Sequence, residues 1–312
     1  MRLEDYNENK KSCYSGCRIN SFSYFHCIPA AGLGTRVLPA TKAIPKEMFP
    51  IVDKPAIQYI VEEAAKSGIE DILIITSRGK SEMEDHFDRM PELESKLIAG
   101  GESKRLMLEQ VVDVTKLANI TYVRQMEQKG LGHAVLQAKK FVGDEPFAVL
   151  YGDDVIIGED PCIGQLIRAY EDTGMCGAVG IKEVSAQDIQ KYSSMKVEPL
   201  KDNIFKVVDM IEKPGPKQIY SLYSILGRCV LPAEIFDILE NISYGAGNEL
   251  QLTDAMKILA KRSGFAGVDF TGVRYDMGNK LGILKASVEV GINHPEIGGE
   301  FRSYLKEIAK SL

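Results

Sequence analysis

The 312-residue sequence has no long apolar stretch and no dense run of basic residues. Its apolar runs are short, as in residues 71–76, whereas a membrane-spanning helix needs about 20 apolar residues. The net charge is −6, and no run of Lys or Arg reaches five residues, so the sequence lacks the basic surface that nucleic acid or an anionic membrane requires. We therefore expect small-molecule partners, no nucleic acid and no membrane span.

The sequence also lacks the signs of export and of a cysteine-based site. Residues 1–10 are polar and acidic and have no apolar signal core. The six cysteines are scattered, and the close pair, Cys13 and Cys17, has neither CxxC spacing nor other ligands nearby. We expect a cytoplasmic protein with reduced cysteines, and we assign no role to the extension formed by residues 1–22.

The patterns that are present predict an α/β protein. Hydrophobic residues make up 45% of the chain and charged residues 26%, as in ordinary globular proteins. Runs of β-branched and apolar residues predict strands over residues 24–29, 71–76, 120–124, 147–151, 177–184, 205–211 and 224–231. Apolar residues at helical spacing predict helices over residues 57–68, 131–142, 164–173, 251–262 and 278–290. Alternating strands and helices favour a mixed, mostly parallel sheet covered on both faces.

Two segments depart from this alternation. Residues 182–227 contain three prolines and strand-like runs without long helices, which predicts an antiparallel insertion. The tail, residues 299–312, places apolar residues on one helical face and is expected either to seal a dimer or to cap the core. No repeat or low-complexity linker divides residues 23–298, which we interpret as one domain.

A turn of small residues follows the first predicted strand and has the composition of a phosphate-binding loop. It consists of Ala30, Ala31, Gly32, Leu33, Gly34, Thr35 and Arg36. Small residues let backbone N–H groups approach a triphosphate. The turn is not the dinucleotide GxGxxG, because Val37 replaces the third glycine, and no GK[ST] follows as in a P-loop. Arg36 and Lys46 supply cations. The alternative is a tight turn with solvated lysines.

A second cluster follows the strand predicted over residues 120–124. The amide of Gln125 has both a donor and an acceptor, which suits a pyrimidine edge, and Gly130 allows a base to lie against the backbone. The alternative is a surface glutamine with a glycine helix cap. His133 has no nucleophile or acid near it in sequence, so we expect it to pack or hydrogen-bond near the site.

Two further clusters carry carboxylates. Asp153 and Asp154 end an apolar strand, where open parallel sheets bind ligands, and Asp153 is the expected Mg²⁺ ligand. Glu212 and Lys213 end another strand before Pro214, so they suit sugar hydroxyls and a sugar phosphate. The alternatives are an acidic turn in the first case and an exposed salt-bridged turn in the second.

Taken in order, these clusters resemble the bacterial UTP–glucose-1-phosphate uridylyltransferases of the sugar nucleotidyltransferase family, from about Cys27 to Val290. Further matching segments are residues 53–60, 84–88, 226–228, 245–254 and 275–282. The resemblance implies a Rossmann-like nucleotidyltransferase core with C-terminal helices, assembled as a homodimer or homotetramer. It also implies transfer of UMP from UTP to glucose 1-phosphate, with Mg²⁺ and release of pyrophosphate.

The resemblance also assigns roles to individual residues. The implied nucleotide-binding residues are Ala30, Ala31, Gly32, Gly34, Thr35, Gln125 and Gly130. The implied metal ligands are Asp153 and Asp276, the implied sugar-phosphate residues are Glu212, Lys213 and Ser193, and the implied catalytic cations are Arg36, Lys46 and Lys213. Because a phosphate is already an anionic nucleophile, the reaction needs alignment and charge compensation and no catalytic triad.

Two residues depart from the family pattern. Ser193 stands where many relatives have a glycine close to the sugar, and Leu222 stands where an asparagine is common. These departures leave three alternatives open: a uridylyltransferase for another hexose 1-phosphate, a thymidylyltransferase, and a nucleotide-sugar-binding regulator without turnover.

Overall fold

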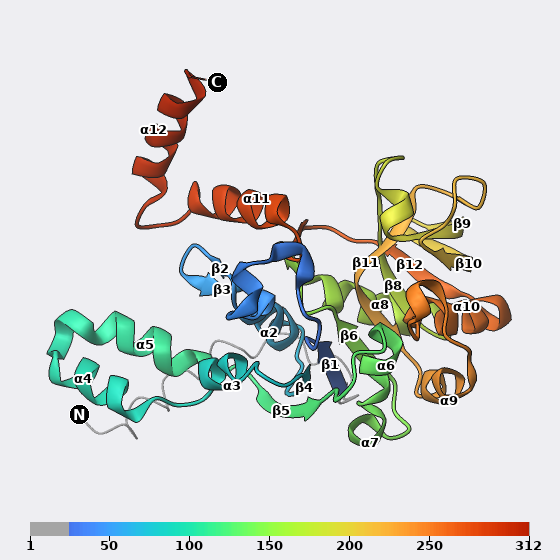
Figure 1. The fold of residues 1–312 in the computed structure, drawn as a ribbon, viewed down its shortest axis with the longest axis horizontal. Coiled ribbons are helices and arrows are strands. Elements are labelled where there is room, and N and C mark those ends of the chain that lie inside the picture. Colours follow the sequence, from blue (N-terminus) through green and yellow to red (C-terminus); the bar gives the residue numbers. More distant parts are fainter. Residues whose placement is uncertain (1–24, 312) are drawn as a thin grey trace.

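The computed structural model describes residues 25–311, and short strands alternate with helices along most of this range (Figure 1). The strands are β1 (Phe25–Pro29), β2 (Pro50–Ile51), β3 (Lys54–Pro55), β4 (Asp71–Thr76), β5 (Asn119–Arg124), β6 (Phe147–Leu150), β7 (Asp154–Ile157), β8 (Ala178–Glu183), β9 (Ser193–Lys201), β10 (Ile204–Glu212), β11 (Tyr223–Leu231), β12 (Phe265–Asp269) and β13 (Val273–Asp276).

The helices lie between and after these strands. They are α2 (Ala56–Lys66), α3 (Glu82–Phe87), α4 (Pro91–Ala99), α5 (Arg105–Val114), α6 (Leu131–Leu136), α7 (Lys139–Val142), α8 (Cys162–Thr173), α9 (Glu234–Asn241), α10 (Leu252–Ser263), α11 (Lys280–Gly291) and α12 (Gly298–Ala309). In the described part of the chain, no helix is long and apolar enough to cross a membrane. Cys13, Cys17 and the extension of residues 1–22 lie outside the described residues.

Nine strands form one mixed sheet in the order β5-β4-β1-β6-β11-β8-β12-β10-β9. The parallel pairs are β5/β4, β4/β1, β1/β6 and β12/β8. The antiparallel pairs are β6/β11, β11/β8, β12/β10 and β10/β9. The mixed α/β sheet is confirmed, but parallel pairs do not outnumber antiparallel ones, because β11 runs against both of its neighbours and β10 runs against β12.

The seven predicted strands are all present, each within one residue of its predicted ends. The antiparallel insertion is also present, as the β9/β10 hairpin at one edge of the same sheet. The helix predicted over residues 131–142 is divided into α6 and α7. At the break, the amides of Gln137 and Ala138 bond to carbonyls three residues back instead of four, which tightens the turn.

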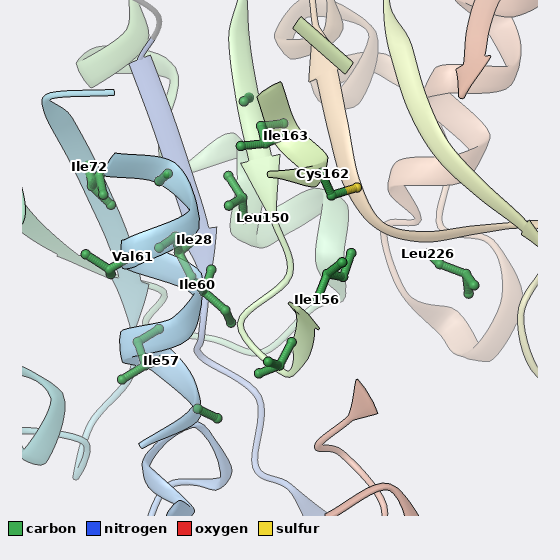
Figure 2. Close-up of a cluster of buried hydrophobic side chains, with 14 of the residues drawn as sticks. Ile28, Ile57, Ile60, Val61, Ile72, Leu150, Ile156, Cys162, Ile163 and Leu226 are labelled. Atoms are coloured by element: carbon green, nitrogen blue, oxygen red, sulfur yellow. The ribbon is translucent and has the colours of Figure 1, made fainter. Parts of the chain in front are cut away.

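Helices cover both faces of the sheet because the strands alternate apolar side chains between the faces. On one face, α2 and α8 pack over Ile72 and Leu150; on the other, α6, α7, α9 and α10 pack over Leu73 and Val149. Figure 2 shows the first face, where the side chains of α2 are directed at the strands. The sheet is thus fixed on both sides, and its strand ends stay free to form a site.

The tail predicted to be helical is helix α12, which extends away from the sheet beyond α11 (Figure 1). Phe301 is its contact to the body, since a Cβ at Gly291 would lie 3.0 Å from the Phe301 ring. Farther along, Tyr304 and Ile308 are exposed. A role for this helix in sealing a dimer or capping the core stays a prediction.

A buried ion pair ties helix α2 to strand β11. The guanidinium of Arg228 is fully buried and donates to both carboxylate oxygens of Glu63, with Nη2 at 2.6 Å from Oε2. Glu63 also accepts from the amide of Ile163 at 2.9 Å, and Arg228 donates to the carbonyl of Gly227 at 3.0 Å. A charge removed from water needs this degree of pairing.

We expect Glu63→Ala to lower the free energy of unfolding by about 3–5 kcal/mol, because it leaves the Arg228 guanidinium buried without a counter-ion. Denaturant unfolding followed by circular dichroism measures the change. The control is Glu70→Ala, an exposed carboxylate, which should change stability by less than about 0.5 kcal/mol. Equal effects of the two substitutions would show that the buried pair does not stabilise the fold.

Candidate active site

Four neighbouring parallel strands end at one edge of the sheet, and their following residues form the candidate site. The glycine loop, residues 30–36, follows β1, Asp153 follows β6, Lys80 lies after β4, and Gln125 follows β5. Ligands of open α/β sheets bind outside these carboxyl ends. The topology therefore gathers three of the four sequence clusters at one edge.

Within the glycine loop, two positions exclude larger residues. Gly34 has a φ of 65°, and a Cβ there would lie 2.9 Å from Thr41 Cγ2. The Thr41 hydroxyl donates to the Gly34 carbonyl at 2.8 Å and holds the turn. A Cβ at Gly32 would lie 3.6 Å from the Lys46 ammonium, so Lys46 lies directly beside the loop. Conformation and crowding thus place a cation next to exposed backbone N–H groups.

Opposite charges meet beside this loop. The Lys46 ammonium lies 2.5 Å from Asp153 Oδ2, and the Arg36 guanidinium lies 3.8 Å from Asp153 and 3.7 Å from Asp276. Asp276 also accepts from the amide of Gly278 at 2.8 Å. Burial raises the pKa of Asp153, but Lys46 and Arg36 outweigh burial, so this pKa lies below its ordinary value. Asp153 is therefore a carboxylate at neutral pH.

The two aspartates are brought together by the pairing of β7 with β13. The amide of Met277 donates to the carbonyl of Asp153 at 2.8 Å, and Asp276 lies opposite Asp154 in the antiparallel register. Asp154 is directed elsewhere, toward Arg274 at 2.5 Å and against Gly227. Burial raises the pKa of Asp154 to about 6 although Arg274 opposes the shift. The structure thus separates the two neighbouring carboxylates into two environments.

At the end of β5, the side chain of Gln125 is buried, with 4% of its surface exposed. Its Nε2 lies 3.2 Å from the Gly130 carbonyl and 2.9 Å from His133 Nδ1. Gln128 ties the same segment to the glycine loop by donating to the carbonyl of Ala31 at 2.8 Å. Gln125 is therefore neither exposed nor a free surface amide.

The glycines of this segment have a packing reason that sequence reasoning missed. A Cβ at Gly130, whose φ is 103°, would lie 2.8 Å from the carbonyl oxygen of Leu250. A Cβ at Gly132 would lie 2.7 Å from the same oxygen, which accepts from the Gly132 amide at 2.8 Å. Close approach of the chain before α10 thus requires both glycines, whatever they contact on the nucleotide side.

The fourth cluster lies around a cavity of about 90 Å³ between the start of β9 and the end of β10. Its lining includes Tyr192, Ser193, Glu212, Gln251 and Thr253. The Glu212 carboxylate accepts from the Thr253 hydroxyl at 2.8 Å. Burial raises the pKa of Glu212, and Asp254 and Glu249 add to the shift. Glu212 therefore faces a partly enclosed polar space, not an exposed turn.

Lys213 and Glu212 diverge at the end of β10. Lys213 is exposed, has a φ of 46°, and forms no ion pair with a carboxylate among residues 25–311. Its backbone amide donates to the carbonyl of Tyr192 at 2.8 Å. The Tyr192 hydroxyl in turn donates to Asp276 at 3.2 Å. Tyr192, which sequence reasoning did not single out, thus connects the cavity to the paired aspartates.

Comparison with known proteins follows the same boundaries. A model of the nucleotidyl transferase family matches residues 27–291. The chain belongs to this family.

The relatives of this nucleotidyltransferase narrow the resemblance. It is 51% identical over 284 residues to the UTP–glucose-1-phosphate uridylyltransferase YngB of Bacillus subtilis, covering 91% of this chain and 94% of the relative. It also resembles a UDP-glucose pyrophosphorylase complexed with UDP-glucose, with 39% identity, a TM-score of 0.78, and coverage of 86% and 98%. A UTP-bound UGPase from Acinetobacter baumannii has 35% identity, a TM-score of 0.80, and coverage of 92% and 99%.

A buried ion pair supports the glycine loop of this nucleotidyltransferase from below. The Lys80 ammonium, 7% exposed, lies 2.8 Å from Glu47 and donates to the carbonyl of Ala30. Burial lowers the pKa of Lys80 and raises the pKa of Glu47, and each charge opposes the shift of the other. Sequence reasoning missed this pair. The strand-end rule, applied to β4 as it was to β6, would have found Lys80.

Lys80→Met should lower the free energy of unfolding by about 3–5 kcal/mol, because the Glu47 carboxylate then stays buried without its cation. The double variant Lys80→Met with Glu47→Gln should regain a large part of this loss, because no charge remains unpaired. Thermal and denaturant unfolding of both variants measure the difference, with the exposed Lys66→Met as control. If the double variant is no more stable than the single one, the uncompensated charge is not the cause.

Proposed function

We propose that this chain transfers UMP from UTP to glucose 1-phosphate and releases pyrophosphate. The observation that carries the proposal is the meeting of Asp153, Asp276, Lys46 and Arg36 beside the glycine loop, at the carboxyl ends of parallel strands. The solved relatives support the choice of ligands, since one is described as UTP-bound and the other as complexed with UDP-glucose. This chain spans nearly the full length of both.

In the proposed reaction, a phosphate oxygen of the sugar 1-phosphate attacks the α-phosphorus of UTP in line. The new O–P bond forms as the bond between the α-phosphorus and its bridging oxygen breaks, and pyrophosphate leaves with the electron pair. The attacking phosphate is already anionic, so no side chain has to remove a proton. The protein must hold two anions in line and offset their repulsion.

The described residues are suited to that task. Backbone N–H groups of the glycine loop and the Lys46 ammonium lie side by side, which favours the UTP phosphates. Arg36 is 60% exposed and can turn from the aspartates to a phosphate oxygen. Lys213 carries a cation free of carboxylate partners among residues 25–311, at the end of β10 next to the cavity, where a sugar phosphate would lie.

Asp153 and Asp276 fit a magnesium ion. A Cβ at Gly278 would lie 2.8 Å from Asp153 Oδ2 and 2.9 Å from Asp276 Oδ1, so glycine leaves a small space between two carboxylate oxygens. Mg²⁺ prefers oxygen ligands and is commonly held by one or two carboxylates together with substrate phosphates and water. When bound, the ion would neutralise charge on the phosphates. Lys46 and Arg36 compensate the two carboxylates in its place here.

Glucose is the proposed sugar, and Ser193 is the residue that makes the pocket differ from many relatives. Its side chain is 4% exposed, and its Oγ accepts from the amide of Ile225 at 3.1 Å and lies 3.3 Å from Ser224 Oγ. The hydroxyl is thus engaged by the protein, and Ser193 acts on the pocket mainly through its volume. The expected homo-oligomer and the cytoplasmic location stay predictions.

A pyrophosphate-release assay tests the function directly. The purified protein is tested with four nucleoside triphosphates and with glucose and galactose 1-phosphates, with and without Mg²⁺. We expect turnover with UTP, glucose 1-phosphate and Mg²⁺ to exceed every other combination. No release with any pair would refute the enzyme, and a preference for a different sugar or nucleotide would refute the substrate assignment alone.

Asp153→Asn should lower kcat/KM for UTP by at least about 100-fold at saturating Mg²⁺, because it removes a charged oxygen ligand beside the phosphates. The fold should persist, since the cations it releases, Lys46 and Arg36, are not fully buried. Thermal unfolding checks this point. Asp144→Asn, an exposed aspartate before β6, serves as control. A rate close to that of the control would contradict the metal role of Asp153.

Ser193→Gly should change the ratio of kcat/KM for glucose 1-phosphate to that for galactose 1-phosphate, because it enlarges the cavity beside Glu212. Ser224→Ala removes the hydroxyl partner of Ser193 but keeps the Cβ at position 193, so it should leave this ratio unchanged. Steady-state kinetics with both sugars measure the two variants. An unchanged ratio in Ser193→Gly would show that this position does not select the sugar.

A further inference from the structure

The orientation of the Gln125 amide is determined by the protein around it. The carbonyl oxygen of Gly130, 3.2 Å from Gln125 Nε2, can only accept a hydrogen bond. The group of Gln125 that faces it must therefore be the NH₂ group. The reverse orientation would bring two acceptor oxygens together inside a buried site, where an unmet hydrogen bond is costly.

The second hydrogen of the same NH₂ group has a partner in His133. His133 Nδ1 lies 2.9 Å from Gln125 Nε2. Because Nε2 can only donate, Nδ1 must accept, so the imidazole is neutral and carries its proton on the other ring nitrogen. Both amide hydrogens are thus occupied. Among residues 25–311, no group donates to Gln125 Oε1, the remaining polar atom of this side chain.

We propose that His133 is a positioning residue that holds Gln125 with Oε1 facing the base, and that this contact selects UTP over CTP. The inference rests on the proposed function and deepens it. Gln128 holds the segment that carries Gln125 against the glycine loop, so a nucleotide whose phosphates lie on that loop has its base within reach of this segment. His133 touches Gln125 and acts on the base through it.

The chemistry of the bases gives the selectivity. Uracil presents an N3–H donor, which pairs with the Oε1 acceptor, whereas the N3 atom of cytosine is an acceptor and would meet Oε1 with its lone pair. A buried site that leaves polar groups unpaired rejects the wrong ligand strongly. Thymine has the same edge as uracil. His133 therefore selects against cytosine and has no effect on the choice between UTP and dTTP.

The surroundings of His133 favour its neutral form. Burial and the Lys129 ammonium lower the pKa of His133, while the Glu127 carboxylate and a hydrogen bond with the Glu127 backbone oppose the shift. Lys129 and Glu127 pair with each other in the segment before α6. From the elements packed on α6, Leu239 of α9 and Cys27 of β1 face the same cluster, and burial raises the pKa of the Cys27 thiol, which stays neutral.

Two substitutions separate hydrogen bonding from packing. His133→Leu removes the acceptor, and His133→Asn replaces Nδ1 with an amide oxygen that also accepts but does not titrate. We expect His133→Leu to raise KM for UTP by about tenfold, the effect of roughly one hydrogen bond, with kcat less affected. Its UTP-to-CTP ratio of kcat/KM should fall by at least as much, while the UTP-to-dTTP ratio stays unchanged. His133→Asn should restore both values.

The pH dependence of binding gives a second measurement. A protonated His133 would present an N–H donor to Gln125 Nε2, which cannot accept, and would disturb the amide. Because the pKa of His133 lies below its usual value of about 6.5, UDP-glucose binding should be intact at pH 7.5 and weaken as the pH falls below about 6.5. Calorimetric titration with UDP-glucose measures this, and His133→Asn should lack this low-pH loss.

The outcomes keep this inference apart from the proposed function. If the unsubstituted protein turns over no nucleotide and binds no UDP-glucose, the function itself is refuted. If it does both, but His133→Leu keeps the UTP-to-CTP ratio, His133 does not position Gln125. A His133→Leu variant that fails to fold leaves two decisive results: a pH-independent affinity in the unsubstituted protein, or the same low-pH loss in His133→Asn, would each overturn the inference. The control Gln137→Ala, on the next turn of α6, should change none of these values.

Discussion

The short antiparallel pairing of β13 with β7 is the constraint on which the rest of the site depends. It places Asp276 beside Asp153, although the two lie on opposite sides of a long stretch of chain. Two carboxylates at close range repel each other, and here Lys46 and Arg36, from the segment after β1, lie against them. The glycine loop is next to Lys46, and Tyr192 connects Asp276 to the cavity. Phosphate loop, aspartates and cavity therefore form one connected arrangement.

Buried charges in this protein are paired and bonded to backbone groups as well. Arg228 and Glu63 join β11 to α2, and Lys80 and Glu47 support the start of the glycine loop. Each pair links segments far apart in the chain, and each also bonds to a main-chain group at one end. Such pairs fix relative positions because neither charge can leave its partner without remaining unpaired in a low-dielectric interior.

The sequence predicted the regular framework well and the site unevenly. The seven predicted strands and the helices α2, α8, α10 and α11 rest on apolar periodicity, a local property, and they are confirmed within about two residues. Strands β7 and β13, with four residues each, are too short to show a period, and helices α3 to α5 were missed. Asp276 entered only through resemblance. The roles of the site residues stay predictions, while their gathering at one edge follows from parallel strands ending together.

The sequence by itself determined the α/β class, the family, and which residues follow the strand ends. Only the tertiary structure decided which charges meet: Asp153 with Lys46, Asp154 with Arg274, and Lys80 with Glu47. It also showed that Gly130 and Gly132 are required by the carbonyl of Leu250, and that Gln125 is oriented by Gly130 and His133. The physical reason is that periodicity and turn chemistry act between neighbours in the chain. Electrostatic pairing, packing and hydrogen bonding act between neighbours in space.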